Sequence, residues 1–554
     1  MDPIYKEIKK LAKGKQISKP ELENLKIKLA KKYHLGNLPR DSDILLNTGL
    51  DIKTKSVRTL SGVAPIAVMT KPERCPHGKC TFCPGGPGSY FGDTPQSYTG
   101  KEPSTMRAIR NNYDPYLIVF NRLEQYVCMN QSAEKVEVII QGGTFPALNK
   151  EYQEYVVKYI LKAMNDFSVV FYKGRKLQIK KFKKFFELPS NINSPERSKK
   201  IQEKLLKLKK ETSLEKEQER NESAQVRCIG LTIETKPDWG FLEQGNEMLR
   251  LGCTRVELGV QCLDDNILKA THRGHTLEDT KKSFQILKDL GFKINAHVML
   301  GLPSQTKAAM LQEIKELFQN PDYKPDMLKL YPCLVLPGTP LYAQWKSGAY
   351  KPLTVEETAD IIAEAKRFIP KWCRIMRIQR DIPSTVIASG PIKTNLRQEV
   401  EALCKKRNIQ CQCIRCRESG RKKVENPEIT VEEYNSSKGK EFFISIEDKK
   451  NNGLVGFCRL RFPSQQLRKE MTEKTAIIRE LHVFSQALPL KENPKENSQQ
   501  HRGYGKQLML KAEALSKERK KDKVVVIAGI GVKEYYIKKL GYKKDGPYVS
   551  KLLN

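Results

Sequence analysis

The run Cys75-Pro-His-Gly-Lys-Cys80-Thr-Phe-Cys83 decides how this chain of 554 residues is interpreted, and a glycine-rich stretch at 84–88 follows it directly. Three thiolates on one loop can hold a cubane iron–sulfur cluster with one iron left open. An open iron can chelate the amino and carboxylate groups of S-adenosylmethionine. A structural zinc site is the alternative, with His77 as the one local candidate for a fourth ligand. We therefore expect Cys75, Cys80 and Cys83 to bind a 4Fe-4S cluster.

Short apolar runs alternate with helical patterns between residues 61 and 380. The expected strands are Val63–Met69, Val136–Gln141, Arg227–Glu234, Arg255–Gln261, Lys293–Gly301 and Met327–Leu330. Helical patterns separate them, as in Leu277–Leu290 and Ala308–Phe318. Repeated strand-then-helix units predict parallel strands that are buried on both faces and close fully or partly into a barrel. The active site of such a barrel lies at the carboxyl ends of its strands.

Polar residues recur at those strand ends. Gln141 and a glycine pair end the second strand, and Glu234 ends the third. Lys329 and Tyr331 lie two residues apart at the end of the sixth, so both side chains face the barrel interior. The alternative role for Lys329 is a structural ion pair.

The charge of the chain predicts a polyanionic partner. There are 99 basic and 64 acidic residues, a net charge of +35. Nucleic acid explains this excess better than a lysine-rich background composition, and no basic amphipathic helix with an aromatic face favours a membrane surface. Residues 1–60 predict short basic helices at Ile4–Leu11 and Pro20–Tyr33, which form either a packed cap or an RNA-gripping arm.

The fourteen cysteines do not indicate a disulfide-stapled secreted scaffold in a chain of this length. No apolar run approaches the length of a membrane span, and Met1–Lys15 has no hydrophobic signal region. We therefore expect a cytoplasmic protein with reduced thiols and no membrane partner.

Two further segments stand out. Residues 186–224 are rich in Lys, Glu, Asn and Ser, which predicts an insertion that is either flexible or a solvated helix. Cys411, Cys413 and Cys416 form a Cys-x-Cys-x2-Cys clip, most simply explained as structural zinc. Cys404 could be the fourth ligand or could lie on the buried face of the preceding helix, and Cys373 is another candidate.

From about residue 430 the pattern changes to antiparallel strands. The expected strands are Glu441–Ile446, Leu454–Phe462, Ala476–Phe484, Val524–Ala528 and Tyr548–Leu552. A glycine loop, Gln500-His501-Arg502-Gly503-Tyr504-Gly505, precedes a long helix. Glycines let backbone N–H groups approach a phosphate, and a helix N-terminus favours its negative charge.

This ordered set resembles the GNAT acetyltransferase fold, in which the glycine loop takes the coenzyme A pyrophosphate. The barrel resembles radical-SAM enzymes, although its Cys-x4-Cys-x2-Cys spacing is one residue longer than the common one. A radical-SAM-type partial barrel followed by an α+β GNAT-like domain resembles one family, the catalytic subunit of Elongator. The matching words include Gln96-Ser-Tyr-Thr-Gly, Asp114-Pro-Tyr-Leu, Gly142-Gly-Thr-Phe, Thr232-Ile-Glu-Thr, Arg273-Gly-His-Thr, Leu328-Lys-Leu-Tyr-Pro, Gln379-Arg-Asp-Ile-Pro and Arg479-Glu-Leu-His-Val.

The short cysteine spacer and the complete clip resemble the archaeal or bacterial type that acts without the other Elongator subunits. The expected domains are 1–60, a basic helical tRNA-binding segment; 61–385, the barrel with its insertion at 186–224; 386–430, a linker with the cysteine clip; and 431–554, the GNAT-like domain.

The resemblance implies modification of the wobble uridine of tRNA to 5-carboxymethyluridine, using acetyl-CoA and S-adenosylmethionine. A 5′-deoxyadenosyl radical would abstract a hydrogen from the acetyl methyl group, and the carbon radical would add to C5 of uracil. Thioester hydrolysis then leaves the carboxymethyl group. The tRNA must present an unstacked wobble base, which suits an anticodon loop.

The same resemblance implies the roles of individual residues. Lys329 and Tyr331 would handle acetyl-CoA at the radical site. Residues expected to contact S-adenosylmethionine are Gln141, Gly142, Gly143 and Glu234, with Gln261 and Arg273 as weaker candidates. Residues expected near coenzyme A are Gln500, Arg502, Gly503, Gly505, Tyr535 and Tyr536, although helix packing explains either tyrosine taken singly.

Two rival functions remain open from the residues. A protein lysine acetyltransferase would use the barrel only as a scaffold, with Glu480 as a candidate general base. A tRNA-binding protein would use acetyl-CoA turnover only to gate release of the tRNA. The first rival predicts dispensable cluster cysteines, and the second predicts binding without a modified nucleoside.

Overall fold

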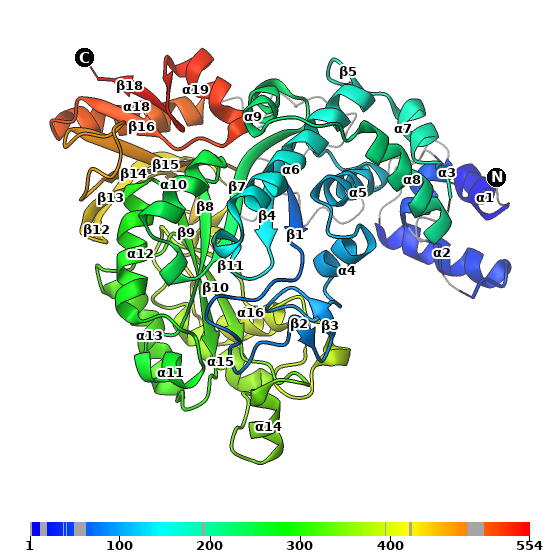
Figure 1. The fold of residues 1–554 in the computed structure, drawn as a ribbon, viewed down its shortest axis with the longest axis horizontal. Coiled ribbons are helices and arrows are strands. Elements are labelled where there is room, and N and C mark those ends of the chain that lie inside the picture. The colour runs from blue at the N-terminus through cyan, green and yellow to red at the C-terminus, as the bar shows by residue number, and fades with distance from the viewer. Residues whose placement is uncertain are drawn as a thin grey trace.

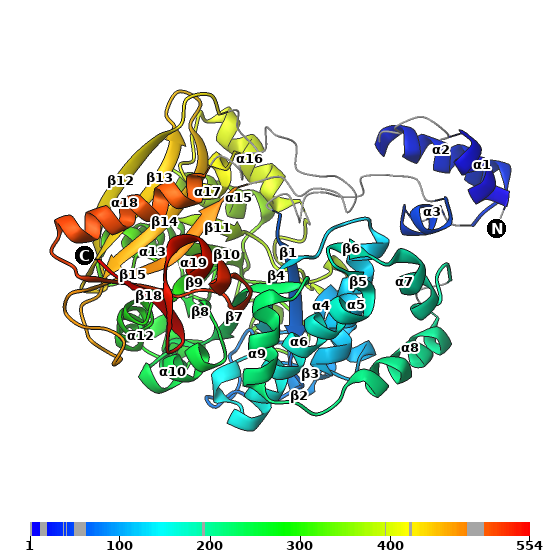
Figure 2. The same cartoon turned by 90° about the horizontal axis from the view of Figure 1, so that it is seen from above.

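The computed structural model describes residues 3–11, 19–36, 38–39, 41–48, 62–190, 194–393, 395–419, 424–484 and 503–553. Two seven-stranded sheets form the body of the molecule. Figure 1 shows the first sheet at the centre, in blue to yellow-green, and the second at one end, in yellow to red. The amino-terminal helices lie apart from both, as the view from above makes plain (Figure 2).

The first sheet is a parallel half-barrel with strand order β1-β4-β7-β8-β9-β10-β11. Its strands are β1 (Ala64–Met69), β4 (Lys135–Gln141), β7 (Arg227–Thr235), β8 (Arg255–Gln261), β9 (Lys293–Leu300), β10 (Met327–Pro332) and β11 (Arg374–Arg377). The six expected strands are confirmed. The sequence reading missed β11, whose four residues include three that are charged or flexible, Arg374, Met376 and Arg377.

Several helices cover the outer face of this sheet, as parallel strands require. The helices of this part of the chain are α4 (Pro103–Arg110), α5 (Pro115–Cys128), α6 (Lys150–Phe171), α7 (Ile179–Phe185), α8 (Pro195–Leu208), α9 (Leu214–Ser223), α10 (Leu242–Arg250), α11 (Asp265–Ala270), α12 (Leu277–Asp289), α13 (Lys307–Gln319), α14 (Pro340–Lys346), α15 (Val355–Ala365), α16 (Leu396–Lys406) and α17 (Ile414–Arg417). Local capping residues fix where several of these helices begin. Thr276 and Asp279 form a capping box at the start of α12, which fixes its first turn.

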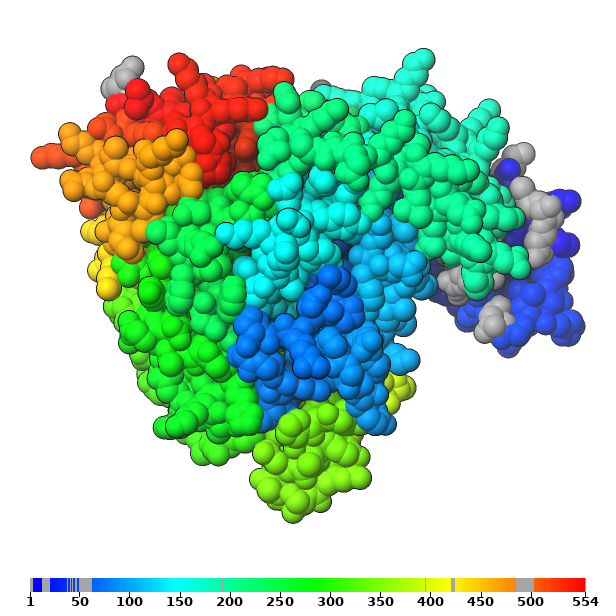
Figure 3. Space-filling view, viewed as in Figure 1, coloured from blue at the N-terminus to red at the C-terminus, as the bar shows by residue number. Residues whose placement is uncertain are grey.

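Two short hairpins complete this part of the chain. They are β2 (Gly86–Ser89) with β3 (Gly92–Thr94), and β5 (Tyr172–Lys173) with β6 (Lys176–Leu177). The first hairpin follows the cysteine loop, and Tyr90 at its tip packs on Gly338 just before α14. In the space-filling view α14 projects from the end of the barrel opposite to the second sheet (Figure 3).

The second sheet has the order β12-β13-β14-β15-β16-β18-β17. Its strands are β12 (Glu428–Ser436), β13 (Gly439–Asp448), β14 (Gly453–Phe462), β15 (Thr475–Val483), β16 (Lys523–Val526), β17 (Lys543–Asp545) and β18 (Tyr548–Leu552), with helices α18 (Tyr504–Glu518) and α19 (Lys533–Leu540). One face packs on α18 around Ile444, Leu460 and Leu508. The five expected strands are confirmed, and β12 and β17 are additional.

The other face of the second sheet covers the amino-terminal end of the half-barrel. Tyr548 of β18 donates a hydrogen bond to the Leu290 carbonyl at 2.9 Å. A Cβ on Gly529, just after β16, would lie 2.0 Å from the carbonyl oxygen of Ile229 in β7. Only glycine permits so close an approach of the two backbones, so the two units dock tightly at this point.

A buried network of ions crosses this junction. Arg479 of β15 binds Asp326, which precedes β10, through two hydrogen bonds of 2.6 and 2.8 Å. Arg461 of β14 binds Asp289 of α12 at 2.6 Å. Glu441 of β13 accepts from both arginines at 2.9 Å. All five side chains are almost completely buried, so removal of any one would leave an uncompensated charge.

The amino-terminal lobe consists of α1 (Pro3–Leu11), α2 (Lys19–Lys32) and α3 (Asp41–Thr48), which share a small apolar core that includes Ile8, Leu22 and Ile44. The two helices expected here are confirmed, and α3 is additional. The lobe is therefore a packed unit with lysines on its outer side.

The charged stretch at 186–224 is helical rather than flexible in its described part, where α8 and α9 lie. Asn221 of α9 is buried, accepts from the Cys228 amide at 2.7 Å and donates to the Val226 carbonyl. Helix α9 thus holds the start of β7 in place. For α9, the expectation of a solvated helix is therefore wrong. None of the described helices is both long and apolar enough to cross a membrane.

Candidate active site

The cysteine loop follows β1 and lies at the carboxyl end of the half-barrel. The Cys83 sulfur accepts a hydrogen bond from the Ser97 amide at 3.2 Å. The Cys80 sulfur lies 3.4 Å from Nη1 of Arg273, which donates to it, and 3.2 Å from Nε2 of His77. The Cys75 sulfur lies 3.6 Å from the Thr144 hydroxyl. All three thiols therefore lie where the fold places an active site, with N–H or hydroxyl groups beside each sulfur atom.

The donor set fits an iron–sulfur cluster. Burial raises the pKa of Cys83 to about 11 and also raises the pKa of Cys75. The Ser97 amide and the Arg273 guanidinium oppose this by favouring the thiolate form. Cys80 and Cys83 are buried and Cys75 is half-buried. Three such thiolates on one loop need a cation to hold them together, and thiolates are the ligands of Fe–S clusters.

The glycine pair after β4 brings that strand against the loop. Gly142 has φ 131°, and a Cβ there would lie 2.1 Å from Oγ1 of Thr70. Gly143 has φ 96°, and a Cβ there would lie 3.4 Å from the Cys75 sulfur. Glycine is needed at Gly142 for both its backbone conformation and its space. The backbone at Gly143 therefore lies close beside the Cys75 sulfur.

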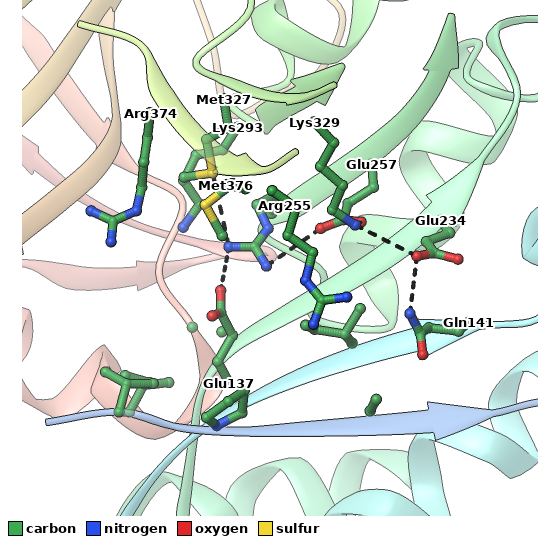
Figure 4. A pocket seen from close by; sticks show the side chains of 18 of the residues that line it. Glu137, Gln141, Glu234, Arg255, Glu257, Lys293, Met327, Lys329, Arg374 and Met376 are labelled. Atoms are coloured by element: carbon green, nitrogen blue, oxygen red, sulfur yellow. Dashed lines mark hydrogen bonds and ion pairs between the residues drawn. The ribbon is translucent and has the colours of Figure 1, made fainter. Parts of the chain in front are cut away.

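A charged cluster occupies the barrel interior below the loop (Figure 4). Lys329 of β10 forms an ion pair with Glu257 of β8. Nε2 of His297, on β9 between them, lies 2.9 Å from the same carboxylate oxygen. Glu234 of β7 lies 3.8 Å from the Lys329 ammonium and accepts a hydrogen bond from Gln141 at 3.2 Å.

These contacts set the protonation states. Burial alone would raise the pKa of Glu257, but Lys329, His297 and Arg255 hold it well below its usual value. Burial also disfavours a charged Lys329, yet the neighbouring Glu257 raises the lysine pKa above its ordinary value. Burial and Lys329 lower the pKa of His297. At neutral pH the cluster therefore holds a carboxylate, an ammonium and a neutral imidazole.

The ion pair expected as the alternative role of Lys329 is present, and it leaves the ammonium facing the cavity. Tyr331, two residues on, has its ring 5.9 Å from that of His297 and also lines the cavity. Gln261 and Arg273 lie at the same level, at the carboxyl end of β8, where Arg273 donates to the Gly259 carbonyl at 2.8 Å. The structure brings all of these predicted residues together.

The second cysteine group lies apart from this cluster, around α17. The sulfur atoms of Cys411, Cys413 and Cys416 lie within 4.8 Å of one another. A single tetrahedral zinc ion holds its thiolates about 3.8 Å apart, so this spacing fits one ion. The Lys366 ammonium lies 3.9 Å from the Cys416 sulfur. Cys404 is buried on α16 and is not part of the triplet.

The glycine loop of the second sheet is described only from Gly503 onward, so Gln500 and Arg502 lie outside the described residues. Gly503 has φ 73° and caps the start of α18. A Cβ on Gly505 would lie 3.0 Å from the hydroxyl oxygen of Tyr535. The structure thus brings Gly505 and Tyr535 together, and Tyr536, although buried in the apolar core beside α18, lines the same cavity as these two residues.

One cavity of about 2260 Å³ reaches both sites. At one end it is lined by the three loop cysteines, and at the other by Gly503, Gly505 and Tyr535. Between them it passes through the barrel interior and along β15, where Glu480 and His482 line it. The cysteine loop and the start of α18 therefore face a common space.

Comparisons with known proteins agree with this arrangement. Residues 69–317 match the Radical SAM superfamily, and residues 325–406 match the Radical_SAM C-terminal domain. The tRNA uridine(34) acetyltransferase of Methanocaldococcus jannaschii is 44% identical over 559 aligned residues, which cover 98% of this chain and 95% of that protein. Elongator complex protein 3 of Saccharomyces cerevisiae is 38% identical, over 96% of this chain and 91% of its own length.

This chain belongs to the Elongator complex protein 3 family. A solved structure titled as archaeal Methanocaldococcus infernus Elp3 with an N-terminal deletion matches with a TM-score of 0.73 at 40% identity, covering 89% of this chain and 100% of that one. The radical-SAM match contains the loop at 75–83, whereas the clip at 411–416 lies outside both matched segments. The family match therefore supports the first loop, not the clip, as the iron–sulfur site.

The sequence reading missed two residues of the charged cluster. Glu257 and Arg255 alternate with apolar residues in the strand Arg-Val-Glu-Leu-Gly-Val-Gln. In a parallel strand that is buried on both faces, a continuous apolar run is expected, so alternating charges indicate a polar interior. This alternation of charged and apolar residues is the signal in the sequence by which Glu257 and Arg255 could have been found.

Proposed function

We propose that this chain modifies the wobble uridine, position 34, of tRNA to 5-carboxymethyluridine with acetyl-CoA and S-adenosylmethionine. The common cavity carries this proposal, because a radical site and a coenzyme A site that share one space can act on one acetyl group. The names of the relatives, a tRNA uridine(34) acetyltransferase and Elongator complex protein 3, support the choice of substrate. A tRNA substrate in turn favours a cytoplasmic location.

In this proposal Cys75, Cys80 and Cys83 hold the 4Fe-4S cluster, which when bound supplies the electron that cleaves S-adenosylmethionine. Gln141, Glu234 and the backbone amides of the glycine pair would bind the methionine and ribose groups. Tyr98 donates to Glu234 at 3.0 Å and keeps that carboxylate in place. Gln261 and Arg273 close the same end of the cavity.

Lys329 and Tyr331 would orient the acetyl thioester below the cluster. The Lys329 ammonium is fixed by Glu257 and can donate to a thioester carbonyl oxygen, which withdraws electron density from the acyl carbon. The neutral His297 beside it can accept a proton from water during thioester hydrolysis. Burial of the whole group excludes bulk water, which protects a radical from side reactions.

Coenzyme A would bind at the start of α18, with Gly503 and Gly505 facing its pyrophosphate and Tyr535 nearby. Gln500 and Arg502 complete that proposed site. The helices of residues 1–60, with the lysines on their outer side, would grip tRNA phosphates. This division assigns the barrel at 61–385 to the radical step and residues 431–554 to coenzyme A.

A specific observation weakens the protein acetyltransferase alternative. Burial alone would raise the pKa of Glu480, but Lys293 and Arg459 hold it below its ordinary value. Arg459 also donates to this carboxylate at 2.9 Å. A carboxylate stabilised in its charged form is a poor general base toward an amine.

Nucleoside mass spectrometry tests the proposed function. Anaerobically reconstituted protein with tRNA, acetyl-CoA and S-adenosylmethionine should form 5-carboxymethyluridine, and the Cys80→Ala variant should form none. The affinity of the variant for tRNA should stay unchanged. Equal acetylation of a protein lysine by both chains, without a modified nucleoside, would instead support the acetyltransferase alternative.

We also propose that the clip at 411–416 holds a structural zinc ion at the junction of the two sheets. Metal analysis of purified protein should find about one zinc per chain beside the cluster iron. Cys413→Ser should lose that zinc and keep the iron. Retention of zinc by the variant, or loss of iron with it, would contradict this assignment.

A further inference from the structure

The interior of the half-barrel carries charged side chains at its amino-terminal end as well as beside Lys329. Barrels of parallel strands are normally filled by layers of branched apolar side chains. Here the inward positions at the amino-terminal end hold Glu137 of β4, Gly230 of β7, Arg255 of β8 and Lys293 of β9, and all four line the cavity. An interior of this kind cannot be a packed core, so it is space that a polar ligand can enter.

Arg255 is the group in this region that the proposed function leaves without a role. Its side chain is 4% exposed and forms an ion pair with Glu137. Its Nη2 lies 3.7 Å from Glu257, and neither Nε nor Nη2 has a hydrogen-bond partner. Figure 4 shows the guanidinium between these carboxylates and beside Met327. A buried donor without an acceptor is costly, so two on one side chain indicate a missing ligand.

The charge around Arg255 selects the class of ligand. Glu137 pairs with the guanidinium and Glu257 pairs with Lys329, while Lys293 also lines this end of the cavity. An anionic ligand at Nε and Nη2 of Arg255 would be repelled by the two carboxylates beside them, which Lys293 would offset only in part. A neutral carbonyl oxygen can accept from Nε and Nη2 without adding charge, so an amide or thioester carbonyl fits best.

The second sheet opens toward this place. Strands β15 and β16 pair from Thr475 to Ile478 and separate after that point. The cavity follows the opening, lined by Leu481 and Val483 on one side and Gly529 on the other. Because Gly529 touches β7 at Ile229, the opening leads directly to the amino-terminal end of the barrel.

We propose that the acyl-pantetheine arm of acetyl-CoA enters the half-barrel through its amino-terminal end, between β4, β7 and β8, and that Arg255 binds a carbonyl oxygen of this arm. The inference rests on the proposed function and adds the route of the substrate. The acetyl group then points up the barrel toward Lys329 and Tyr331. The cluster is reached from the opposite end, where the tRNA base would enter.

A size series at Gly230 tests the route. A Cβ at Gly230 would meet no atom closer than 3.7 Å, so an alanine methyl group fits there without a backbone shift, and a longer side chain would extend into the cavity that Gly230 lines. Formation of 5-carboxymethyluridine should fall from glycine through alanine to leucine, with a loss of about 100-fold or more for Gly230→Leu because its side chain fills the entrance. Cluster iron and tRNA affinity should stay at the wild-type values. Full activity of Gly230→Leu would overturn the route.

Calorimetry on Arg255→Lys tests the carbonyl contact. Lysine keeps the charge between the two carboxylates and loses the forked donor, so the Kd for acetyl-CoA should rise about 10-fold or more. Arg468→Lys, which alters a partly exposed arginine outside the cavity lining, should leave that Kd unchanged. An unchanged Kd for Arg255→Lys would overturn the contact.

The two proposals fail differently. Absence of product from the wild-type protein, with an intact cluster and bound tRNA, would reject the proposed function. Product from the wild type that Gly230→Leu and Arg255→Lys form equally well would reject the route and leave the function standing.

Discussion

Replacing Arg479 by methionine should lower the free energy of unfolding by about 3–5 kcal/mol, because it breaks a buried ion network and takes one cationic partner from each of Asp326 and Glu441. Arg479 is completely buried and donates four hydrogen bonds to Asp326, Glu441 and the Phe292 carbonyl within 2.9 Å. This arginine joins the second sheet to the barrel. The loss of stability should therefore appear as a lower urea midpoint of unfolding, and the junction should open at a lower urea concentration.

Arg519→Met is the matched control. Arg519 also lies in the second unit and binds Glu433 at 2.8 Å, but its side chain is 45% exposed. Exposed ion pairs contribute at most about 1 kcal/mol, so the urea midpoint of the control should stay close to that of the wild type. Urea titration followed by fluorescence compares the three proteins. Equal midpoints for Arg479→Met and Arg519→Met would show that the buried network does not hold the junction.

The second large effect is expected at Lys329. Lys329→Met should reduce formation of 5-carboxymethyluridine by at least about 100-fold, because the group that orients the acetyl thioester is lost. Glu257 would then be buried without its partner, and its pKa should rise. Single-turnover assays at saturating acetyl-CoA distinguish a slower reaction from weaker binding of acetyl-CoA. The rate constant should fall, and the affinity for acetyl-CoA should not.

A double variant distinguishes an orienting role from a purely structural one. Lys329→Met with Glu257→Gln removes both charges and should recover most of the stability lost in the single variant. Activity should remain low in the double variant. Recovery of activity together with stability would mean that Lys329 serves only to balance Glu257.

Much of the fold could be predicted from the sequence because parallel and antiparallel strands leave regular patterns. The strand Arg255–Gln261 was located to the residue, and β18 likewise. In contrast, β11 is short and rich in arginine, and β12 has polar residues on both faces, so neither carries a strong strand pattern. A helix was one of two alternatives for residues 186–224, and the packing of α9 depends on Asn221, a polar residue that sequence patterns place at the surface.

The candidate site likewise has one part that could be predicted from the sequence and one part that could not. The cysteine loop, Lys329 and the glycine loop are local signals and could be found in the sequence. The pairing of Lys329 with Glu257 joins residues on two strands that are separated by a third, and the ion pairs of Arg479 link distant parts of the chain. Such contacts depend on how the sheets dock, which no local pattern records.

The most direct test of the account uses acetyl-CoA labelled with deuterium in its methyl group, in the same tRNA assay. The proposal that the barrel and the second unit act on one acetyl group predicts deuterium in 5′-deoxyadenosine and a carboxymethyl group on uridine that has lost one deuterium. Carboxymethyluridine formed with only unlabelled 5′-deoxyadenosine would contradict it, because the radical would then have taken its hydrogen from another source.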